Sequence, residues 1–379
     1  MKHLRTITLL LILLLSCSFA MPAMAVLNPS GFADYEYTTD YKGNAIITRY
    51  KGPDTDVVIP SEIDGHSVTS IGTRAFFCHS GIKSVVIPDS VTEINPFAFT
   101  NCTGLSSVVI PDTITYIGGY AFLYCSSISS VTLPPSLTSI QPYTFYGCTS
   151  LCELILPQSL ESIESYALGF TGLSVLALPD SLAQIDTTAF SGCRSLAAFE
   201  VSKDHPVYAV MDGVLYDKIA HALVCYPPAK GGSSYAIQEE TQVINAFALS
   251  CTHLTDLIIP ESVVRIEDNA FAASDLTSVT IPSGITVIPK EAFYNCSNLS
   301  NVCLPEGITN IGDNAFHGCR NLNSILIPES TAFIGQNAFS LYDEATETIV
   351  PNPNITLLVA QDSPIVQYCE TNGLNCSVY

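Results

Sequence analysis

The sequence predicts a curved, β-rich solenoid, in which the chain winds into about 12 stacked coils. Three observations predict it: a proline that recurs at a fixed period, aliphatic residues that alternate before each proline, and an Ala-Phe pair followed by a small residue. Adjoining prolines are 22 or 23 residues apart, at Pro88, Pro111, Pro134, Pro157 and Pro179, and again at Pro260, Pro282, Pro305 and Pro328. A repeat of this length is typical of a solenoid, which grows by adding coils and needs no division into domains.

Each proline follows a short strand. In the repeat around Pro111, Val108 and Ile110 alternate with polar or smaller residues, so one face of the strand is expected to be buried. Proline has no N–H group to donate to a strand ladder, and it therefore belongs just past the strand. Aliphatic residues three and six positions later, such as Ile114 and Ile117, predict a second wall that returns the chain.

The second half of each repeat carries an Ala-Phe pair and then, in most copies, a cysteine. We expect the phenylalanine to fill the interior, where truncating it to alanine costs about 3–5 kcal/mol. The repeated cysteines should form one buried column, with each S–H near a backbone carbonyl. Side chains in one column of a parallel ladder point the same way, about 4.8 Å apart, whereas a disulfide needs converging Cβ atoms. The column members are Cys102, Cys125, Cys148, Cys193, Cys296 and Cys319.

The stretch from Cys102 to Phe122, CTGLSSVVIPDTITYIGGYAF, carries this whole pattern. It resembles the BspA-like, or Treponema-type, leucine-rich repeats of bacterial surface proteins, and the resemblance extends over about Val57 to Phe339. The resemblance implies a leucine-rich-repeat solenoid with a right-handed coil, short helical turns and a cap at each end. It also implies an extracellular binding protein, since some BspA-like proteins are adhesins.

The N-terminal residues 1–25 read as a signal peptide, with Lys2 and Arg5 before an apolar run and Ala23-Met24-Ala25 at its end. An alternative is a lipobox in which Cys17 carries a lipid anchor. Export would place the protein outside the cell or on its surface. The apolar run is too short to span a membrane.

The remaining chain divides into five parts. Residues 26–56 are expected to form an N-terminal hairpin cap around Lys42-Gly43-Asn44, and residues 57–201 the first repeat segment. Residues 202–237 break the period and should form a hairpin island with an Asp212-Gly213 turn, interpreted as a structural wedge. Repeats resume over 238–340. Residues 341–379 should contain an irregular loop, a short helix that begins at Ser363-Pro364 and a C-terminal cap. Cys369 and Cys376 lie outside the column and are the likeliest disulfide.

Charge and motifs limit the function. The chain has 14 Lys and Arg residues against 35 Asp and Glu, a formal net charge of −21, which argues against nucleic acid or an anionic membrane as a partner. No HExxH zinc motif, G-x-S-x-G elbow, phosphate-binding glycine loop or EF-hand loop occurs in the sequence. We therefore expect no enzymatic activity, no metal site and no cofactor.

The outward-facing residues of the strands before each proline are the predicted binding surface. Valine, isoleucine, threonine and leucine recur there beside small polar groups, on a sheet expected at the inner curve; β propensity alone could also explain them. The candidate residues are Ser84, Val86, Ser107, Val109, Ser130, Thr132, Glu153, Ile155, Ile258, Thr280, Cys303 and Leu326. The expected function is adhesion, by binding a protein or glycan of a host or neighbouring cell. A non-adhesive scaffold of the cell envelope and a glycan-binding module stay open as alternatives.

Overall fold

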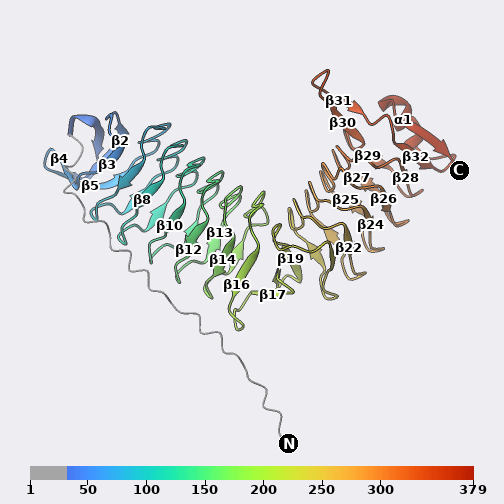
Figure 1. The fold of residues 1–379 in the computed structure, drawn as a ribbon, viewed down its shortest axis with the longest axis horizontal. Coiled ribbons are helices and arrows are strands. Elements are labelled where there is room, and N and C mark those ends of the chain that lie inside the picture. The colour runs from blue at the N-terminus through green and yellow to red at the C-terminus, as the bar shows by residue number, and fades with distance from the viewer. Residues whose placement is uncertain (1–31) are drawn as a thin grey trace, which may run out of the picture.

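A computed structural model describes residues 32–379. Over this range the chain forms an arc of stacked coils that runs from β1 to β33 (Figure 1). The solenoid has about 15 turns, slightly more than the sequence predicts. The predicted signal peptide, residues 1–25, and the alternative lipid-anchor residue Cys17 lie outside the described residues.

Each regular coil contributes two parallel strands. The strands that precede the repeat proline, here called the pre-proline strands, are β3 (Asp56–Val58), β6 (Ser84–Val86), β8 (Ser107–Val109), β10 (Ser130–Thr132), β12 (Glu153–Ile155), β14 (Val175–Leu178), β16 (Ala198–Val201), β20 (Ser234–Ala236), β22 (Asp256–Ile258), β24 (Ser278–Thr280), β26 (Asn301–Cys303) and β28 (Ser324–Leu326). In most of them the middle residue is buried and its neighbours are exposed, which is the alternation expected of a strand with one buried face.

The second strand of each coil, the post-proline strand, is shorter in every coil except the first, where β5 has six residues. These strands are β5 (His66–Ile71), β7 (Glu93–Ile94), β9 (Tyr116–Ile117), β11 (Ser139–Ile140), β13 (Ser162–Ile163), β15 (Gln184–Ile185), β21 (Val243–Ile244), β23 (Arg265–Ile266), β25 (Val287–Ile288), β27 (Asn310–Ile311) and β29 (Phe333–Ile334). Their isoleucines pair in register from coil to coil, as Ile94 does with Ile117.

The third side of the coil is the turn that carries the Ala-Phe pair. Backbone hydrogen bonds join this turn between neighbouring coils, for example from Phe99 N to Ala121 O at 2.8 Å and from Phe122 N to Thr144 O at 2.9 Å. The Phe rings stack in the interior, with centroids 5.3 Å apart for Phe99 and Phe122 and 5.5 Å for Phe122 and Phe145. All three sides of the solenoid are therefore bonded along its axis.

The cysteine column lies next to these rings. The sulfur of Cys125 donates to the carbonyl oxygen of Phe99 at 3.1 Å, and that of Cys148 to the carbonyl of Phe122 at 3.2 Å. The same contact, to a residue in the preceding coil, is made by Cys102, Cys193, Cys296 and Cys319. These thiols are buried and free.

The pre-proline strands lie on the outer side of the arc, so the prediction that they form its inner curve is wrong. In Figure 1, β25, β27 and β29 lie along the inner side of the right arm, and β24, β26 and β28 along the outer side. Strand pairing agrees, because β25, β27 and β29 form one sheet whereas β26 and β28 belong to separate sheets. Coils spread apart on the outer side, where the bond from Leu133 N to Ile155 O reaches 3.5 Å.

The N-terminal end is a small antiparallel addition to the solenoid. After a short 3-10 helix, η1 (Phe32–Asp34), strands β1 (Tyr35–Thr39) and β2 (Ala45–Tyr50) form a hairpin, and β2 pairs in parallel with β5. The long first coil contains β4 (Glu62–Ile63), which turns back onto the start of β5. The hairpin covers the first coil, since the ring of Tyr50 stacks on Phe76 at 5.2 Å.

The island continues the sheet of post-proline strands of the second repeat segment. Strands β17 (Tyr208–Met211), β18 (Val214–Asp217) and β19 (Ala222–Cys225) are antiparallel neighbours, and β19 then pairs in parallel with β21. Alternate residues of β18 face different cores: Leu215 packs into that of the first segment, and Val214 and Tyr216 into that of the second. The hydrophobic interior is thus divided at the island.

The C-terminal part is more regular than predicted. Residues expected as an irregular loop form a hairpin of β30 (Ser340–Asp343) and β31 (Thr348–Pro351). The β-branched run Thr348-Ile349-Val350 favours a strand. The Asp343 carboxylate, which accepts a hydrogen bond from the N–H of Ala345 at 2.9 Å, favours the turn.

Two further strands then continue the solenoid without the repeat motif. Strand β32 (Thr356–Val359) pairs in parallel with β28, and β33 (Asn375–Val378) pairs with β32. They add turns that a count of prolines does not include. Between them lies α1 (Ile365–Asn372), which ends at Gly373 in the left-handed conformation. Cys369 and Cys376 are free thiols, not the expected disulfide; burial, followed by a hydrogen bond with Cys376, raises the pKa of Cys369 to about 12.

Candidate functional site

The predicted strand-face residues lie on the outer surface of the arc. Register pairs place Val86 beside Val109, Thr132 beside Ile155, and Thr280 beside Cys303. Large aliphatic side chains on this face stay in contact with solvent, with exposed fractions of 41% for Val109, 54% for Ile155, 66% for Ile258 and 45% for Leu326. The structure therefore places hydrophobic side chains on the surface here.

The strand face is not one unbroken row. Strand β8 pairs with β6, and β10 with β12, but β8 and β10 belong to different sheets. Ser84 and Val86 are half-buried, and the Ser84 hydroxyl donates to the Asp56 carboxylate at 2.5 Å. Neighbouring candidates are thus brought together in pairs.

A second surface, which sequence reasoning missed, lies on the Ala-Phe turns of the first segment. The residue before the alanine slot, which Thr144 fills in one coil, is aromatic in four consecutive coils: Phe97, Tyr120, Tyr143 and Tyr166. Their rings form a stacked column, with centroids 4.7, 4.8 and 4.9 Å apart and interplanar angles of 11°, 6° and 21°. We call these residues the aromatic ladder. Each side chain is half-buried.

The backbone of the ladder is in an unfavourable conformation. Phe97, Tyr120, Tyr143 and Tyr166 have φ values of 63°, 62°, 56° and 52°. Bulky residues rarely adopt this left-handed region, whereas Asn does so several times more often. Such strain, of order 1–3 kcal/mol per residue, persists where the surrounding structure enforces it and gathers at functional sites.

Further rings flank the ladder. Tyr146 contacts Tyr143 at 5.4 Å and Phe170 at 5.2 Å, and Tyr124 contacts Tyr146 at 5.7 Å. Glycine makes room for two of them: a Cβ at Gly147 would lie 2.4 Å from the ring of Tyr124, and one at Gly192 would lie 2.7 Å from that of Phe170. The turns of the first segment therefore carry an aromatic surface.

The two ends of the ladder differ. At the N-terminal end the guanidinium of Arg74 lies 5.2 Å from the ring centroid of Phe97, in the geometry of a cation–π contact. At the other end Tyr166 meets Phe247 of the second segment edge-on, with centroids 6.1 Å apart. Because these residues come from opposite arms, the ladder ends at the bend of the arc.

Carboxylates surround the bend end of the ladder. Glu164 and Asp186 directly follow β13 and β15, so they occupy the same position in adjacent coils. Burial, then Tyr120 and Asp186, raises the pKa of Tyr143. Burial also raises the pKa of Tyr166, followed by the influence of Tyr143, Asp186 and Glu291. The tyrosines thus stay neutral next to negative charge.

Two open grooves adjoin these residues. One, of about 370 Å³, is lined by Ile163, Glu164, Ala183, Gln184, Ile185, Asp186, Thr187, Tyr208 and Asp217. The other, of about 490 Å³, is lined by Thr138, Ser139, Gln141, Glu161, Ser162, Glu164, Ala183 and Gln184. The described lining of both grooves is acidic or neutral.

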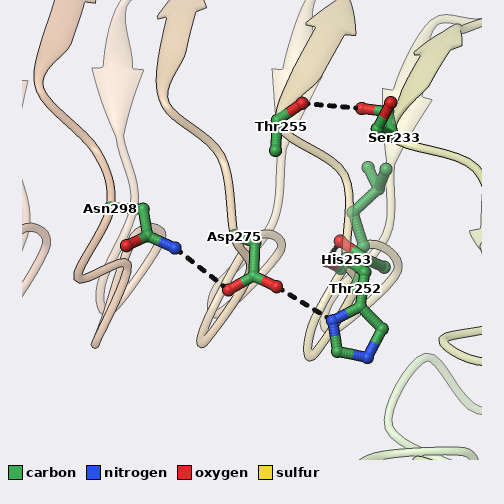
Figure 2. A network of polar contacts seen from close by, with 7 residues as sticks. Ser233, Thr252, His253, Thr255, Asp275 and Asn298 are labelled. Atoms are coloured by element: carbon green, nitrogen blue, oxygen red, sulfur yellow. Dashed lines mark hydrogen bonds and ion pairs between the residues drawn. The ribbon is translucent and has the colours of Figure 1, made fainter.

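A polar network spans three coils of the second segment (Figure 2). The Asp275 carboxylate contacts His253 Nδ1 at 2.9 Å and accepts a hydrogen bond from Asn298 Nδ2 at 3.2 Å. The side chain of His253 is 77% exposed, so the network clamps neighbouring coils at the surface. It does not enclose a site.

The described residues show little reactive chemistry. Within residues 32–379 no group of three or more His, Cys, Asp and Glu side chains is placed to hold a metal ion. Burial raises the pKa of Cys102 and Cys148 to about 12 and that of Cys296 to about 11, which keeps these thiols protonated and unreactive. Over the same residues, no helix is long and apolar enough to cross a membrane.

The fold and its surfaces define a repeat protein that presents broad side-chain surfaces along a solenoid. A family model described as BspA type leucine rich repeat region matches residues 69–197 and 232–354, with 6 copies. The chain belongs to this family. The matching model describes a repeat region, and the match indicates no enzyme family.

Solved structures agree on the fold. The chain is similar to a leucine-rich cell surface protein from Faecalibacterium prausnitzii, with 31% identity, a TM-score of 0.68, and coverage of 84% of this chain and 96% of that one. It also resembles the pneumococcal vaccine antigen PcpA, with 21% identity, a TM-score of 0.73, and coverage of 91% and 96%. A leucine-rich-repeat protein from Eubacterium ventriosum shares 20% identity at a TM-score of 0.50, over 80% and 91%. A search of curated protein sequences gave no match.

Proposed function

We propose that the protein is exported to the bacterial surface and binds a protein ligand of a host or neighbouring cell through the outer strand face. The observation that carries the proposal is the recurrence of exposed aliphatic side chains on this face, where Ile155 and Ile258 are 54% and 66% exposed. Exposed apolar side chains that recur along one face are a feature of interaction surfaces. The family membership and the cell-surface description of the Faecalibacterium relative support the location.

The solenoid offers this face in a way that one coil could not. Each pre-proline strand contributes its two outward side chains, and the buried middle residue fixes their direction. Because the buried core holds each strand, the surface is preformed and little conformational entropy is lost on binding. A protein partner would gain affinity from the aliphatic residues and specificity from the polar residues beside them.

The test is a double variant, Val109→Lys with Ile155→Lys. Both side chains point away from the core, so the stability change should stay within about 0.5 kcal/mol, as for ordinary surface substitutions. Binding to an immobilised extracellular-matrix preparation should fall at least about tenfold, because the new charges lose hydration at the contact. Thr149→Lys with Gln158→Lys, two exposed turn residues, is the matched control. Unchanged binding by the strand-face variant, or equal loss in the control, would remove this face as the site.

A further inference from the structure

We propose that the bend of the arc holds a second binding site, which takes an arginine-rich segment of a protein partner. The aromatic ladder and the acidic grooves next to it form this site, with Tyr166 and Asp186 at its centre. It lies on the Ala-Phe turns and the post-proline strands, away from the outer strand face. The proposal is therefore independent of the proposed function.

The molecule already contains a guanidinium stacked on this ladder. Arg74 occupies the coil position before Ala75, in line with Phe97, and its guanidinium lies 5.2 Å from the Phe97 ring centroid. Planar guanidinium groups stack on aromatic rings better than ammonium groups do. The ladder thus accepts arginine at one end, and its other end offers a tyrosine of the same column.

The bend end has no such cation among the described residues. The cation–π contacts found over residues 32–379 involve Tyr41, Phe77, Phe97, Tyr226 and Tyr235. None of them involves Tyr166. This ring is half-buried; Tyr143 stacks on it at 4.9 Å, and the rings of Tyr146 and Phe247 are each 6.1 Å away at an interplanar angle of 70°.

Negative charge gathers at the same end. Equivalent residues of adjacent coils are about 4.8 Å apart along a parallel ladder, so Glu164 and Asp186 repel each other. Neither forms a salt bridge within the described chain. Glu164 Oε1 accepts from Ser162 at 2.8 Å, and Asp186 Oδ1 accepts from the Thr188 N–H at 2.9 Å. A cation from a partner would relieve this repulsion.

The grooves extend the acidic surface along the coils. Their described linings contain Glu161, Glu164, Asp186 and Asp217 and no lysine or arginine. The net charge of −21 also favours a basic partner. Stacking on tyrosine together with pairing to carboxylates selects arginine over lysine, because arginine provides both a planar face and a fork of donors.

The experiment measures binding of labelled synthetic peptides of alternating arginine and glycine to the full protein, with lysine and glutamate versions as comparison probes. The arginine peptide should bind at least about threefold more tightly than the lysine peptide, and the glutamate peptide should not bind. Some of this preference should persist at about 0.5 M salt, where exposed charge interactions are screened.

Two substitutions locate the site. Asp186→Asn removes the charge but keeps an oxygen that can accept from Thr188, and Tyr166→Asn removes the ring. Each should weaken the arginine peptide about five- to tenfold. Asp112→Asn, an exposed turn residue of the same segment, is the charge-matched control and should leave affinity unchanged. Melting temperatures establish that the variants are folded.

Several outcomes would overturn the proposal. The first is that the arginine peptide does not bind at about 1 mM. The second is that the arginine and lysine peptides bind equally and that salt abolishes both. The third is that Asp112→Asn loses as much affinity for the arginine peptide as Asp186→Asn does. Binding of neutral oligosaccharides that Tyr166→Asn abolishes, without peptide binding, would assign the ladder to a glycan instead.

Discussion

The two repeat segments have the same kind of interior and differ at one surface position. Inside, Phe122 lies 5.3 Å from Phe99 in the first segment, and Phe293 lies 5.3 Å from Phe316 in the second. At the left-handed position before the alanine slot, the first segment has aromatic residues in four consecutive coils, Phe97, Tyr120, Tyr143 and Tyr166. The second segment has one aromatic residue there, Phe247 at the bend, and then Asn269, Glu291, Asn314 and Asn337. Both sets have φ between 52° and 63°.

The second segment shows what the fold alone requires at this position. Asparagine tolerates the left-handed conformation well. Its amides also bond along the axis, since Asn269 Nδ2 donates to Glu291 Oε2 at 2.9 Å and Asn314 Nδ2 donates to Oε1 at 3.5 Å. The coil therefore closes without a ring, and the aromatic residues of the first segment add a surface that the fold does not need.

Alkaline pH should separate the segments most strongly. The first segment has four column thiols, Cys102, Cys125, Cys148 and Cys193, and the second has two, Cys296 and Cys319. Burial raises the pKa of Cys148 from 9.0 to about 12. A raised folded-state pKa gives stability that is complete below pH 9.0 and is lost as the pH rises toward about 12. With four such thiols against two, the first segment should lose more folding stability than the second at alkaline pH.

Circular dichroism from pH 8 to 12, at roughly half-unit steps, measures the loss. Cys148→Ser removes one ionisable group and keeps a donor for the Phe122 carbonyl, so its alkaline midpoint should move upward. Cys303→Ser, at an exposed thiol, should not shift it. A Cys148→Ser midpoint equal to that of the parent would mean that the column does not control alkaline unfolding.

Truncating a core ring should have the next largest effect, and the same effect in both segments. Phe122→Ala and Phe293→Ala each remove a fully buried ring that stacks on two neighbours. Each should cost about 3–5 kcal/mol in unfolding free energy, as measured by urea denaturation. Hydrogen exchange should show loosening mainly in the segment that carries the change, because the interior is divided at the island. Loosening throughout the chain from either variant would show that the segments fold as one unit.

The repeat made most of the fold predictable. Proline spacing and alternation before Pro111 specify a strand, a turn and a second wall, and the family match and the structure of the Faecalibacterium relative agree with that solenoid. The sense of curvature was not predictable, because all three sides of the coil are hydrogen bonded and small differences in spacing decide which side is inside. The turns built by β32 and β33 carry no proline motif to count.

The aromatic ladder was not predicted because the type of residue at its repeat position changes from coil to coil. The same repeat position holds Tyr143 in one coil and Asn314 in another. A periodic pattern of buried hydrophobic residues therefore does not include this position. A signal was present: aromatic residues precede the alanine slot in four consecutive coils. Its spatial partners at the bend, Phe247 and Glu291, come from the other segment. They occupy the same repeat position as Tyr166, but the repeat register does not show that they lie next to it.

The smallest expected effect is that of exchanging the ladder residue itself. Tyr143→Asn places the second segment's residue type in the first. It loses ring contacts with Tyr120, Tyr146 and Tyr166, worth roughly 0.5–1.5 kcal/mol each. It also relieves part of a backbone strain of order 1–3 kcal/mol. These opposing terms should leave the unfolding free energy within about 1 kcal/mol of the parent.

Tyr143→Ala is the matched comparison, because alanine loses the same ring contacts and gains less relief at a φ of 56°. Urea denaturation should therefore rank Tyr143→Ala below Tyr143→Asn in stability. If Tyr143→Asn instead lost about 3 kcal/mol or more, as a buried core ring does, the ladder would be part of what holds the first segment together. In that case the strained aromatic column would need no binding role to explain it, and the contrast between the segments would reflect packing alone.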